Sequence, residues 1–304
     1  MYLHRQCTPF LWYDTNRVQF LQNDVNFTFM PESTTISQEM VQPNTVASMV
    51  AELLTLGIEP GMTLLVHSSL SALGWVAGGP VAVVLALEQV LGQNGTLVMP
   101  THTTGLTEPS LWQNPPVPEA WWETIRHETP AFDPAISPTR KMGAIVECFR
   151  TQPGTLRSTH PHVSFAARGP NAAAITAKHS LEAGLGEESP LARIYDLGGY
   201  VLLLGVGHGN NTSLHLAEYR ATYAGKALTT QGAPMLVAGE RQWVTFDDLD
   251  WSDSDFPQLG ADFAHTTGLE RNGRVGRASV RFMPQRPLVD YGVVWMERER
   301  RSDS

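Results

Sequence analysis

Apolar positions along the chain follow helical and strand patterns in an alternating order. Residues 46–56 carry apolar positions at helical spacing and stop at a glycine, and the continuous apolar run at 61–67 predicts a buried strand. A second helix is predicted over 80–90, which opens on a proline, and a second strand over 95–100. Strand, helix and strand within about 40 residues predict a parallel βαβ unit with a right-handed crossover.

The rest of the pattern extends this unit into one larger domain. Further helices are expected over 142–151, 171–179 and 213–223, and a third strand over 200–205. From about residue 231 the segments become short and alternating, as at 241–246, which predicts a smaller β-rich C-terminal part. We expect an α/β fold over 38–304 with a central, mainly parallel sheet flanked by helices. Residues 1–37 show neither period and predict an extension outside the core.

Composition and charge narrow the function classes. A formal net charge of −9 disfavours nucleic acid as a partner, because phosphate binding needs clustered Lys and Arg, and it favours a cationic ligand. The apolar runs are far shorter than the ~20 residues that span a bilayer, so no membrane contact and a cytoplasmic location are expected. Two cysteines, Cys7 and Cys148, indicate neither a disulfide framework nor a metal site.

Polar side chains follow each of the three predicted strands. They lie at 67–69, at 101–104 and in the glycine-rich turn at 207–215. Because ligands bind outside the carboxyl ends of parallel strands, we expect the three segments to converge. Each segment alone could be a set of helix caps, since Ser, Thr and Asn routinely begin helices, but the three together favour an active site.

The third segment has the most specific chemistry. If Thr212 or Ser213 caps the following helix, His215 lies in its first turn and Glu218 lies three residues later on the same face. The helix N-terminus disfavours an imidazolium and a carboxylate favours it, so His215 is a candidate base near neutral pH. Such a pair is often incidental on a helix surface. Glu147, which stands among apolar neighbours and needs a partner, is a second candidate carboxylate. An outward-facing position beside Arg150 is the equally weighted alternative for Glu147.

The loop after the first strand indicates an anionic ligand. Gly78 and Gly79 end it at a helix N-terminus, where free backbone N–H groups favour an anion such as a pyrophosphate. No Lys follows these glycines and no Gly-x-Gly-x-x-Gly occurs at this turn, so a P-loop and a dinucleotide fingerprint are both disfavoured. Ser68 or Ser69 could donate a hydrogen bond to a carbonyl oxygen that becomes negative in a transition state.

Two histidines raise the alternative of a metal site. His160 and His162 form a His-x-His pair, but further ligands at a suggestive spacing are missing. We therefore favour positioning roles for both residues and expect no metal. The charged residues at 297–301 are interpreted as a solvated end of the chain.

Six segments resemble the antibiotic N-acetyltransferase family, the aminoglycoside 3-N-acetyltransferases. They are HSSLSALG at 67–74, MPT at 99–101, MGAIVE at 142–147, RSTHP at 157–161, SPL at 189–191 and TSLH at 212–215. The resemblance implies the fold of that family, which differs from the larger acetyltransferase superfamily. It also implies transfer of acetyl from acetyl-coenzyme A to the 3-amino group of a 2-deoxystreptamine aminoglycoside, which gives antibiotic resistance.

The resemblance further implies roles for individual residues. His215 corresponds to the general base, with a supporting carboxylate that maps to Glu147 rather than Glu218. Coenzyme contacts are expected from His67, Ser68, Ser69, Leu70, Leu73, Gly74, Val76, Ser158, His160 and Ser164. Contacts with the drug are expected from Thr101, His102, Trp122, Asp133, Asn211 and Asp250.

Two regions bear on the substrate. The segment 247–255 holds five aspartates, and a polycationic drug is a natural ligand for such a surface. An insert at about 105–135, with Trp121, Trp122 and Glu123, reads as a variable lid on the substrate side.

Other functions stay open at this point. One is acyl transfer to a different amine. For any of the functions, the chain is expected to act as a monomer or a dimer. Another is a serine hydrolase that uses Ser68 or Ser213, although no Gly-x-Ser-x-Gly elbow occurs before a helix. A metal-dependent hydrolase built on His102, His160 and His162, and a binding module without turnover, are the remaining alternatives.

Overall fold

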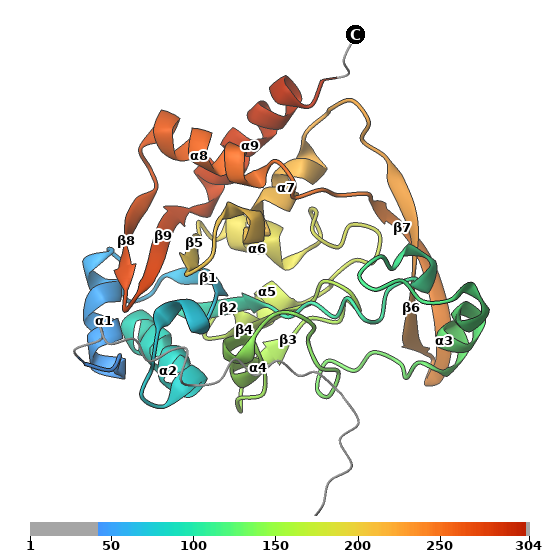
Figure 1. The fold of residues 1–304 in the computed structure, drawn as a ribbon, viewed down its shortest axis with the longest axis horizontal. Helices are drawn as coiled ribbons and strands as arrows, with labels where there is room; N and C mark the ends of the chain where they lie inside the picture. The colour runs from blue at the N-terminus through green and yellow to red at the C-terminus, as the bar shows by residue number, and fades with distance from the viewer. Residues whose placement is uncertain (1–41, 302–304) are drawn as a thin grey trace, which may run out of the picture.

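The fold centres on a seven-stranded mixed sheet, seen in a computed structural model that describes residues 42–301 (Figure 1). The expected extension at 1–37 lies outside the described residues. The sheet has the order β3-β4-β2-β1-β5-β9-β8. Its strands are β1 Thr63–Ser68, β2 Thr96–Pro100, β3 Leu156–Arg157, β4 Phe165–Arg168, β5 Tyr200–Leu204, β8 Arg271–Val275 and β9 Ala278–Pro284. The central strands β2, β1 and β5 run parallel, and the strands at both edges run antiparallel.

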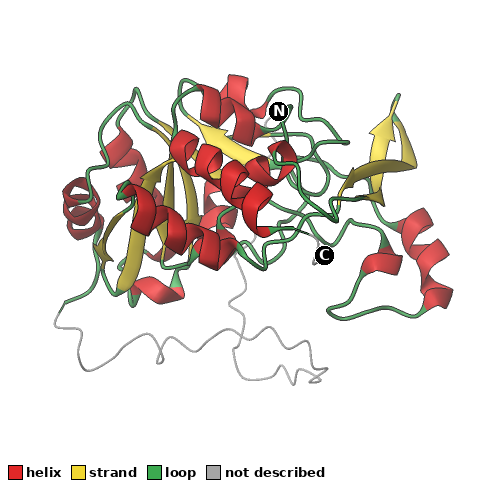
Figure 2. Ribbon diagram, turned by 90° about the horizontal axis from the view of Figure 1, so that it is seen from above, coloured by secondary structure: helices red, strands yellow, loops and turns green. Residues whose placement is uncertain are grey.

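Helices cover both faces of this sheet (Figure 2). One face carries α1 Val46–Thr55, α2 Gly79–Leu91 and α4 Ala144–Arg150. The other carries α5 Ala172–Thr176, α6 Pro190–Asp196, α7 Ser213–Arg220, α8 Phe256–Thr267 and α9 Gln285–Glu299. The expected α/β class and the β1-α2-β2 unit are confirmed. Within the part of the chain that the structure describes, no helix is long and apolar enough to cross a membrane.

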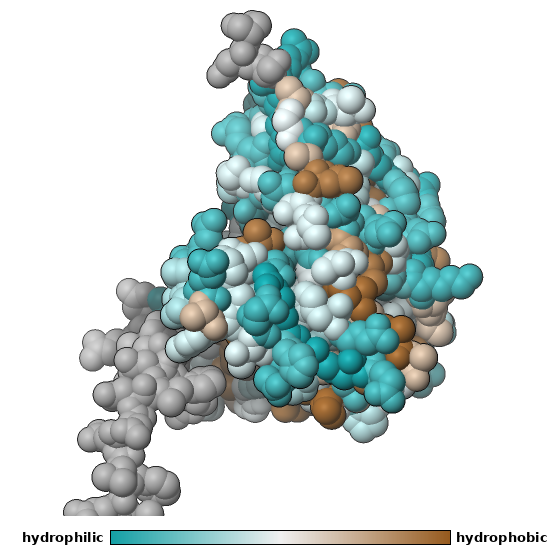
Figure 3. Space-filling view, turned by 90° about the vertical axis from the view of Figure 1, so that its right-hand side faces the viewer, coloured by the Kyte–Doolittle hydropathy of each residue, from teal (hydrophilic) through white to brown (hydrophobic). Residues whose placement is uncertain are grey.

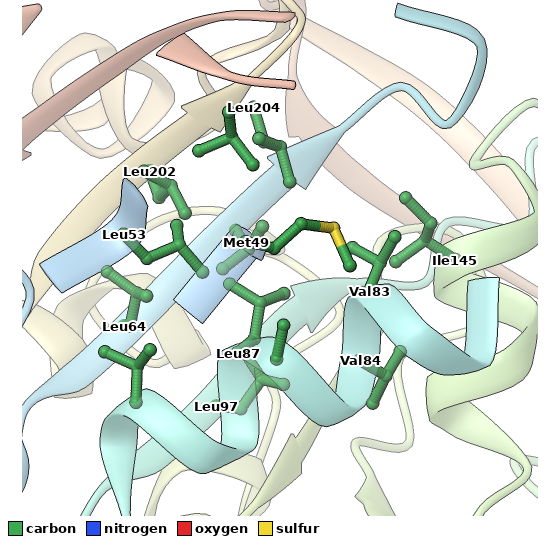
Figure 4. Packing of buried hydrophobic residues seen from close by; sticks show 14 of the residues in the cluster. Met49, Leu53, Leu64, Val83, Val84, Leu87, Leu97, Ile145, Leu202 and Leu204 are labelled. Atoms are coloured by element: carbon green, nitrogen blue, oxygen red, sulfur yellow. The ribbon is translucent and has the colours of Figure 1, made fainter. Parts of the chain in front are cut away.

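The central strands carry apolar residues at successive positions because their side chains point alternately to the two faces of the sheet, and both faces are buried. In β1, Leu64 and Val66 pack with α1 and α2, whereas Leu65 packs on the opposite face, and all three are fully buried. Figure 4 shows the first of these cores, where Met49 of α1 and Leu87 of α2 meet the sheet. Burial on both faces anchors these strands in the core, and the polar residues stand at their carboxyl ends.

The C-terminal part contains the expected strands and, in addition, two long helices. The alternation at 241–246 belongs to a hairpin of β6 Leu228–Val237 and β7 Glu240–Leu249, which forms a separate two-stranded sheet. After the hairpin, however, come the long helices α8 and α9, with β8 and β9 between them joining the main sheet. The sequence indicates the short strands because their apolar alternation is clear. It does not indicate α9, because this helix buries only six residues, Gln285 and Gly292 among them, and its apolar stripe is therefore weak.

The insert and the hairpin together form an arm beside the sheet (Figures 1 and 2). The insert contains η3 Pro109–Leu111, η4 Glu119–Trp121 and α3 Trp122–Glu128. Arg241 of β7 donates to the Thr129 carbonyl at 3.1 Å, and the Phe132 N–H donates to the Pro234 carbonyl at 2.8 Å. Hydrophilic and hydrophobic side chains alternate on the molecular face on this side, without one broad hydrophobic patch (Figure 3).

Candidate active site

A pocket lies where β1, β2 and β5 end, and the three polar segments converge there as expected. Its lining includes His67 and Ser68 from β1, His102 after β2, and Thr212 and His215 after β5. About 770 Å³ of empty space, part of it open to solvent, lies between these groups. Ligands bind at this position in open parallel sheets, outside the carboxyl ends of the strands. The pocket is therefore the candidate active site.

His215 is held in one orientation by its neighbours. It lies in the first turn of α7 and is 5% exposed. Its Nδ1 is 2.8 Å from Oε2 of Glu218, so Nδ1 donates to this carboxylate and Nε2 keeps its lone pair. Trp251 and Phe256 contact the imidazole from two directions, with ring centroids 4.7 and 4.8 Å away. The geometry suits a proton acceptor that is fixed before a ligand arrives.

The turn before His215 is capped differently from the expectation. Thr212 makes no side-chain cap, and the amide oxygen of Asn211 instead accepts from the Ser213 N–H at 3.3 Å. The Thr212 hydroxyl lies 3.3 Å from Nε2 of His67, at the pocket. The Asn211 cap thus leaves the Thr212 hydroxyl on the ligand side.

Glu218 is a fully buried carboxylate whose charge is compensated on every side. Besides His215, it accepts from the Ser252 N–H at 2.9 Å and from Nη1 of Arg300 at 2.6 Å. Burial raises the pKa of this carboxyl, but the hydrogen bonds from His215, Ser252 and Arg300 outweigh burial and hold the pKa below its ordinary value. Glu218 is therefore ionised at neutral pH and can stabilise a positive charge on His215.

The structure corrects the expected pairing of Glu147 with His215. The Glu147 carboxylate accepts from the Thr139 N–H at 2.7 Å and from Nε of Arg150 at 2.8 Å. Burial raises its pKa, and the bonds from Arg150 and Thr139 lower it further than burial raises it. Glu147 belongs to the same helix as Val146, which does line the pocket, but it faces the loop before α4. Glu147 therefore binds this loop to α4.

Two further histidines in the pocket are neutral. Burial, together with the nearby His215, lowers the pKa of His67 to about 3. Burial lowers the pKa of His102 to about 3 as well, with smaller effects from His67 and His215. Nε2 of His102 and Oγ of Ser68 are buried and have no hydrogen-bond partner in the protein within residues 42–301. Unpartnered polar atoms in a pocket fit a ligand that brings its own hydrogen-bonding groups, such as the carbonyl oxygen of a thioester or an amide.

The other residues expected at the coenzyme lie away from the pocket lining. Leu73 and Val76 are buried in the core between α1, α2 and the sheet, so their side chains are not available to a ligand. The Ser69 hydroxyl is 3.1 Å from that of Ser71. Leu70 packs against the same core, and Gly74 has a φ of 82°, which explains why a glycine stands there. For Ser69, Leu70 and Gly74, contact with the coenzyme stays a prediction.

Ser158, His160, Ser164 and Thr101 form the interior beneath the pocket. All four are at most 1% exposed, and none lines the pocket. Ser164 and Thr101 hydroxyls lie 3.1 Å apart, and Ser164 also donates to the Thr101 carbonyl. Ser158 accepts from the Phe165 N–H at 2.9 Å. Burial with internal partners argues against direct ligand contact and for support of the strand end that carries His102.

Three buried histidines complete this interior network. Nδ1 of His160 accepts from the N–H groups of His162 and Val163, both at 3.1 Å. His162 donates from Nε2 to the Gly232 carbonyl of the hairpin at 3.1 Å, and His179 donates to the Gly184 carbonyl at 2.6 Å. Within residues 42–301, no group of three or more His, Cys, Asp or Glu side chains is arranged to hold a metal ion. The contacts of His160 and His162 are those of positioning residues.

The five buried histidines of the pocket and of the interior network lead us to expect a steep loss of folding stability in acid. Burial lowers the pKa of His162 and His179 to about 4, that of His67 and His102 to about 3, and that of His160 well below its ordinary value. The unfolded chain binds protons at about pH 6.5 and the folded one does not, so stability is present above that pH and falls as the pH drops below it. Each histidine contributes a slope of about 1.4 kcal/mol per pH unit.

Urea unfolding between about pH 7.5 and 5 measures this slope. We expect His162→Gln, whose amide can still donate to Gly232, to reduce the slope by about 1.4 kcal/mol per pH unit. His127→Gln, at an exposed position on α3, serves as the control and is expected to keep the parent slope. An unfolding free energy that does not change over this pH range contradicts the prediction.

The residues expected at the drug divide into two groups. His102 and Asn211 line the pocket, whereas Trp122 lies in the arm and Asp133 accepts from the Ala135 N–H in a turn of its own. Asp250 is exposed and does not line the pocket. Their contacts with a drug stay predictions.

The acidic segment is largely occupied by contacts within the protein. Asp247 accepts from Thr230 at 2.6 Å, Asp248 accepts from Tyr219 at 2.5 Å, and Asp255 binds Arg300. Asp253 is the aspartate of this segment that lines the pocket. The expected anionic surface is therefore narrower than five carboxylates.

Among the residues of the site that the sequence does not predict are Trp251, Asp253, Lys141 and Arg300. Trp251 and Asp253 stand in the acidic segment, of which only the total charge enters the sequence argument, and Lys141 precedes the Met-Gly motif without a signal of its own. Arg300 was assigned to a solvated end, yet its side chain is 14% exposed and reaches Glu218 across 82 residues. An aromatic residue inside an acidic segment was a usable signal, whereas nothing in the sequence indicated the Arg300 contact.

Several known proteins resemble this chain over most of its length. A family model described as aminoglycoside 3-N-acetyltransferase matches residues 65–297. The SPbeta prophage-derived aminoglycoside N(3')-acetyltransferase-like protein YokD of Bacillus subtilis is 44% identical over 83% of this chain and 92% of its own length. Aminoglycoside N(3)-acetyltransferase VII of Streptomyces paromomycinus is 38% identical over 84% of this chain and 93% of its own. A solved structure described as AAC-IIIb binary with CoASH aligns with a TM-score of 0.77 at 31% identity, over 86% of this chain and all of that one.

Proposed function

Because the chain belongs to the aminoglycoside 3-N-acetyltransferase family, we propose that it is an acyltransferase that moves the acetyl group of acetyl-coenzyme A to the 3-amino group of a 2-deoxystreptamine aminoglycoside. One observation carries the mechanism: the buried His215–Glu218 pair, with Nε2 of His215 at the pocket. The relatives' names and a relative's complex with coenzyme A support the two substrates.

In the proposed reaction, acetyl-coenzyme A supplies a thioester that the amine nitrogen attacks directly. His215 Nε2 accepts the proton that the amine loses as the new N–C bond forms. Glu218 stabilises the resulting imidazolium through Nδ1. The C–S bond then breaks, and His215 returns the proton to the departing sulfur, so that the enzyme ends in its starting form.

Ser68 and His102 are the proposed donors to the carbonyl oxygen that becomes negative during attack. Their side-chain atoms are buried and unpartnered within the described chain, so no bond within the protein must break before they donate. His67 and His102 stay neutral at the reaction pH because burial lowers the pKa of each imidazole to about 3. These two histidines therefore add no positive charge beside the imidazolium.

Lys141 and Asp253 lie at the pocket with opposite charges. We assign Lys141 to binding of the anionic coenzyme and Asp253 to binding of an ammonium group of the drug. In this proposal the chain forms a single domain, and the arm covers the side on which the drug binds. The backbone at Lys141 is left-handed, with a φ of 62°. Two contacts hold the turn that contains it: the Arg140 N–H donates to the His102 carbonyl, and Glu147 accepts from the Thr139 N–H.

This assignment predicts that the two Michaelis constants respond to different residues. Asp253→Asn is expected to raise KM for the drug, and Lys141→Gln to raise KM for the coenzyme, each about two- to fivefold because both groups are exposed. Asp250→Asn, an exposed aspartate outside the pocket lining, is the matched control. Equal effects of Asp253→Asn and Asp250→Asn on the drug's KM contradict the assignment.

Thiol release from acetyl-coenzyme A, measured with a panel of aminoglycosides and of unrelated amines, tests the proposed substrate. We expect release with aminoglycosides that carry a free 3-amino group and none with derivatives in which this group is blocked. Silence on the whole aminoglycoside panel, with turnover of another amine, overturns the substrate and leaves the acyl transfer standing.

A further inference from the structure

The carboxylate of Glu218 has two oxygens, and the second one binds a cation that lies beyond the family-model match. Oε2 accepts from His215, and Oε1 accepts from Nη1 of Arg300 at 2.6 Å. Arg300 caps the end of α9, three residues past the last matched position. We propose that Arg300 is a positioning residue, which fixes the Glu218 carboxylate and sets the pH at which His215 accepts a proton. The inference rests on the proposed function.

Arg300 is itself held rigidly. Its Nε and Nη2 bind the two oxygens of Asp255, each at 2.7 Å, and Nη2 also donates to the Ser252 carbonyl at 3.1 Å. The guanidinium stacks on the ring of Tyr223 at 4.9 Å from its centroid. This bidentate fork fixes both the position and the plane of the cation, so Nη1 can point only toward Glu218.

The same contacts tie together the segments that surround His215. Asp255 and Ser252 flank the stretch that carries Trp251 and leads into Phe256, the two rings that contact the imidazole. The Arg300 carbonyl accepts from the Ala224 N–H, after α7. Arg300 thus joins α7, α9 and the segment before α8 at one point, although it does not line the pocket.

The charge of Arg300 acts on His215 through the shared carboxylate. With Arg300 present, the negative charge of Glu218 is divided between two cations once His215 is protonated. Without Arg300, the whole charge faces His215 alone, which favours the imidazolium, and His215 then accepts its proton at a higher pH. A base that is already protonated cannot accept the amine proton, so activity is lost on the acid side.

Other titratable groups around the pair do not supply this effect. They are His67, His102, Lys141, Tyr223, Lys226 and Asp253. Burial keeps His67 and His102 neutral, each with a pKa of about 3. Burial raises the pKa of Tyr223 and lowers that of Lys226, but Glu218 and Arg300 carry the charges in direct contact with the pair.

The experiment compares Arg300→Met, Arg300→Lys and the control Arg298→Met in the full chain. Arg298 lies on the same helix but is exposed and pairs with Glu299. We expect Arg300→Met to move the acid limb of the kcat profile up by about one pH unit, so that kcat below the limb falls about tenfold with little change in KM. Arg300→Lys should recover part of the shift, and Arg298→Met should match the parent.

Two further measurements make the result decisive. In a Glu218→Gln background, Arg300→Met should cause no further loss, since its effect passes through Glu218; a full additional loss overturns the proposal. An NMR titration of the His215 imidazole should show its midpoint move to higher pH in Arg300→Met, or in Arg300→Lys if the methionine variant does not fold. A midpoint that does not move overturns the proposal about Arg300, and this readout needs no activity on aminoglycosides. A parent enzyme that is inactive on aminoglycosides counts only against the proposed function.

Discussion

Replacement of His215 by alanine is expected to lower kcat/KM for acetyl transfer by about 10²–10⁴-fold. The imidazole is the group at the pocket with a buried carboxylate on one nitrogen and a lone pair on the other. Its loss removes the acceptor for the amine proton, and neither His67 nor His102 can replace it. Burial lowers the pKa of each of those two to about 3, which makes them much weaker bases.

The comparison needs a histidine that is exposed and distant. His265 on α8 meets this condition, and His265→Ala is expected to keep the parent rate. Initial rates of thiol release, with circular dichroism to verify folding, measure both variants. A rate for His215→Ala within a few-fold of the parent means that another group is the base.

Glu218→Gln is expected to lower kcat by about 10²-fold, with a smaller change in KM. The amide cannot stabilise an imidazolium, and its NH₂ can donate to Nδ1, which would shift the proton of His215 to Nε2 and remove the lone pair from the pocket. Glu147→Gln is the matched comparison, because both residues are partly or fully buried glutamates on short helices.

For Glu147→Gln, the expected effect is on stability and coenzyme binding rather than on kcat. The change weakens the contacts with Thr139 and Arg150 that secure the turn before α4. Steady-state kinetics and thermal unfolding of the two variants separate the roles. A large fall in kcat for Glu147→Gln with a normal kcat for Glu218→Gln would restore the pairing that the family resemblance implied.

The central part of the fold could be predicted because its signals are local. The apolar runs that form β1, β2 and β5 are continuous, and parallel strands place their carboxyl ends at one edge. The convergence of residues 67–69, 101–104 and 207–215 follows from that geometry alone. His215 and Glu218 also could be predicted as a pair, since three residues on a helix put them on the same face.

The rest depended on contacts between distant segments. Spacing indicated Glu218 as the partner of His215, whereas the resemblance indicated Glu147, and only the fold shows that Glu147 faces the loop at Thr139. The Arg300 contact joins residues far apart in sequence, and charge at a chain end normally indicates solvent. The interior position of Ser158 and His160 likewise follows from how β3 and β4 pair, not from their motif.

Direct transfer of the acetyl group to the amine is the central claim, and the mass of the enzyme tests it. The protein is mixed with acetyl-coenzyme A alone, quenched after a single turnover time and weighed, and the same is done with an aminoglycoside present. The mechanism predicts an unmodified enzyme in both samples and one coenzyme thiol released for each acetylated drug. An acetyl group found on Ser68 or Ser213 that then passes to the drug or to water contradicts it.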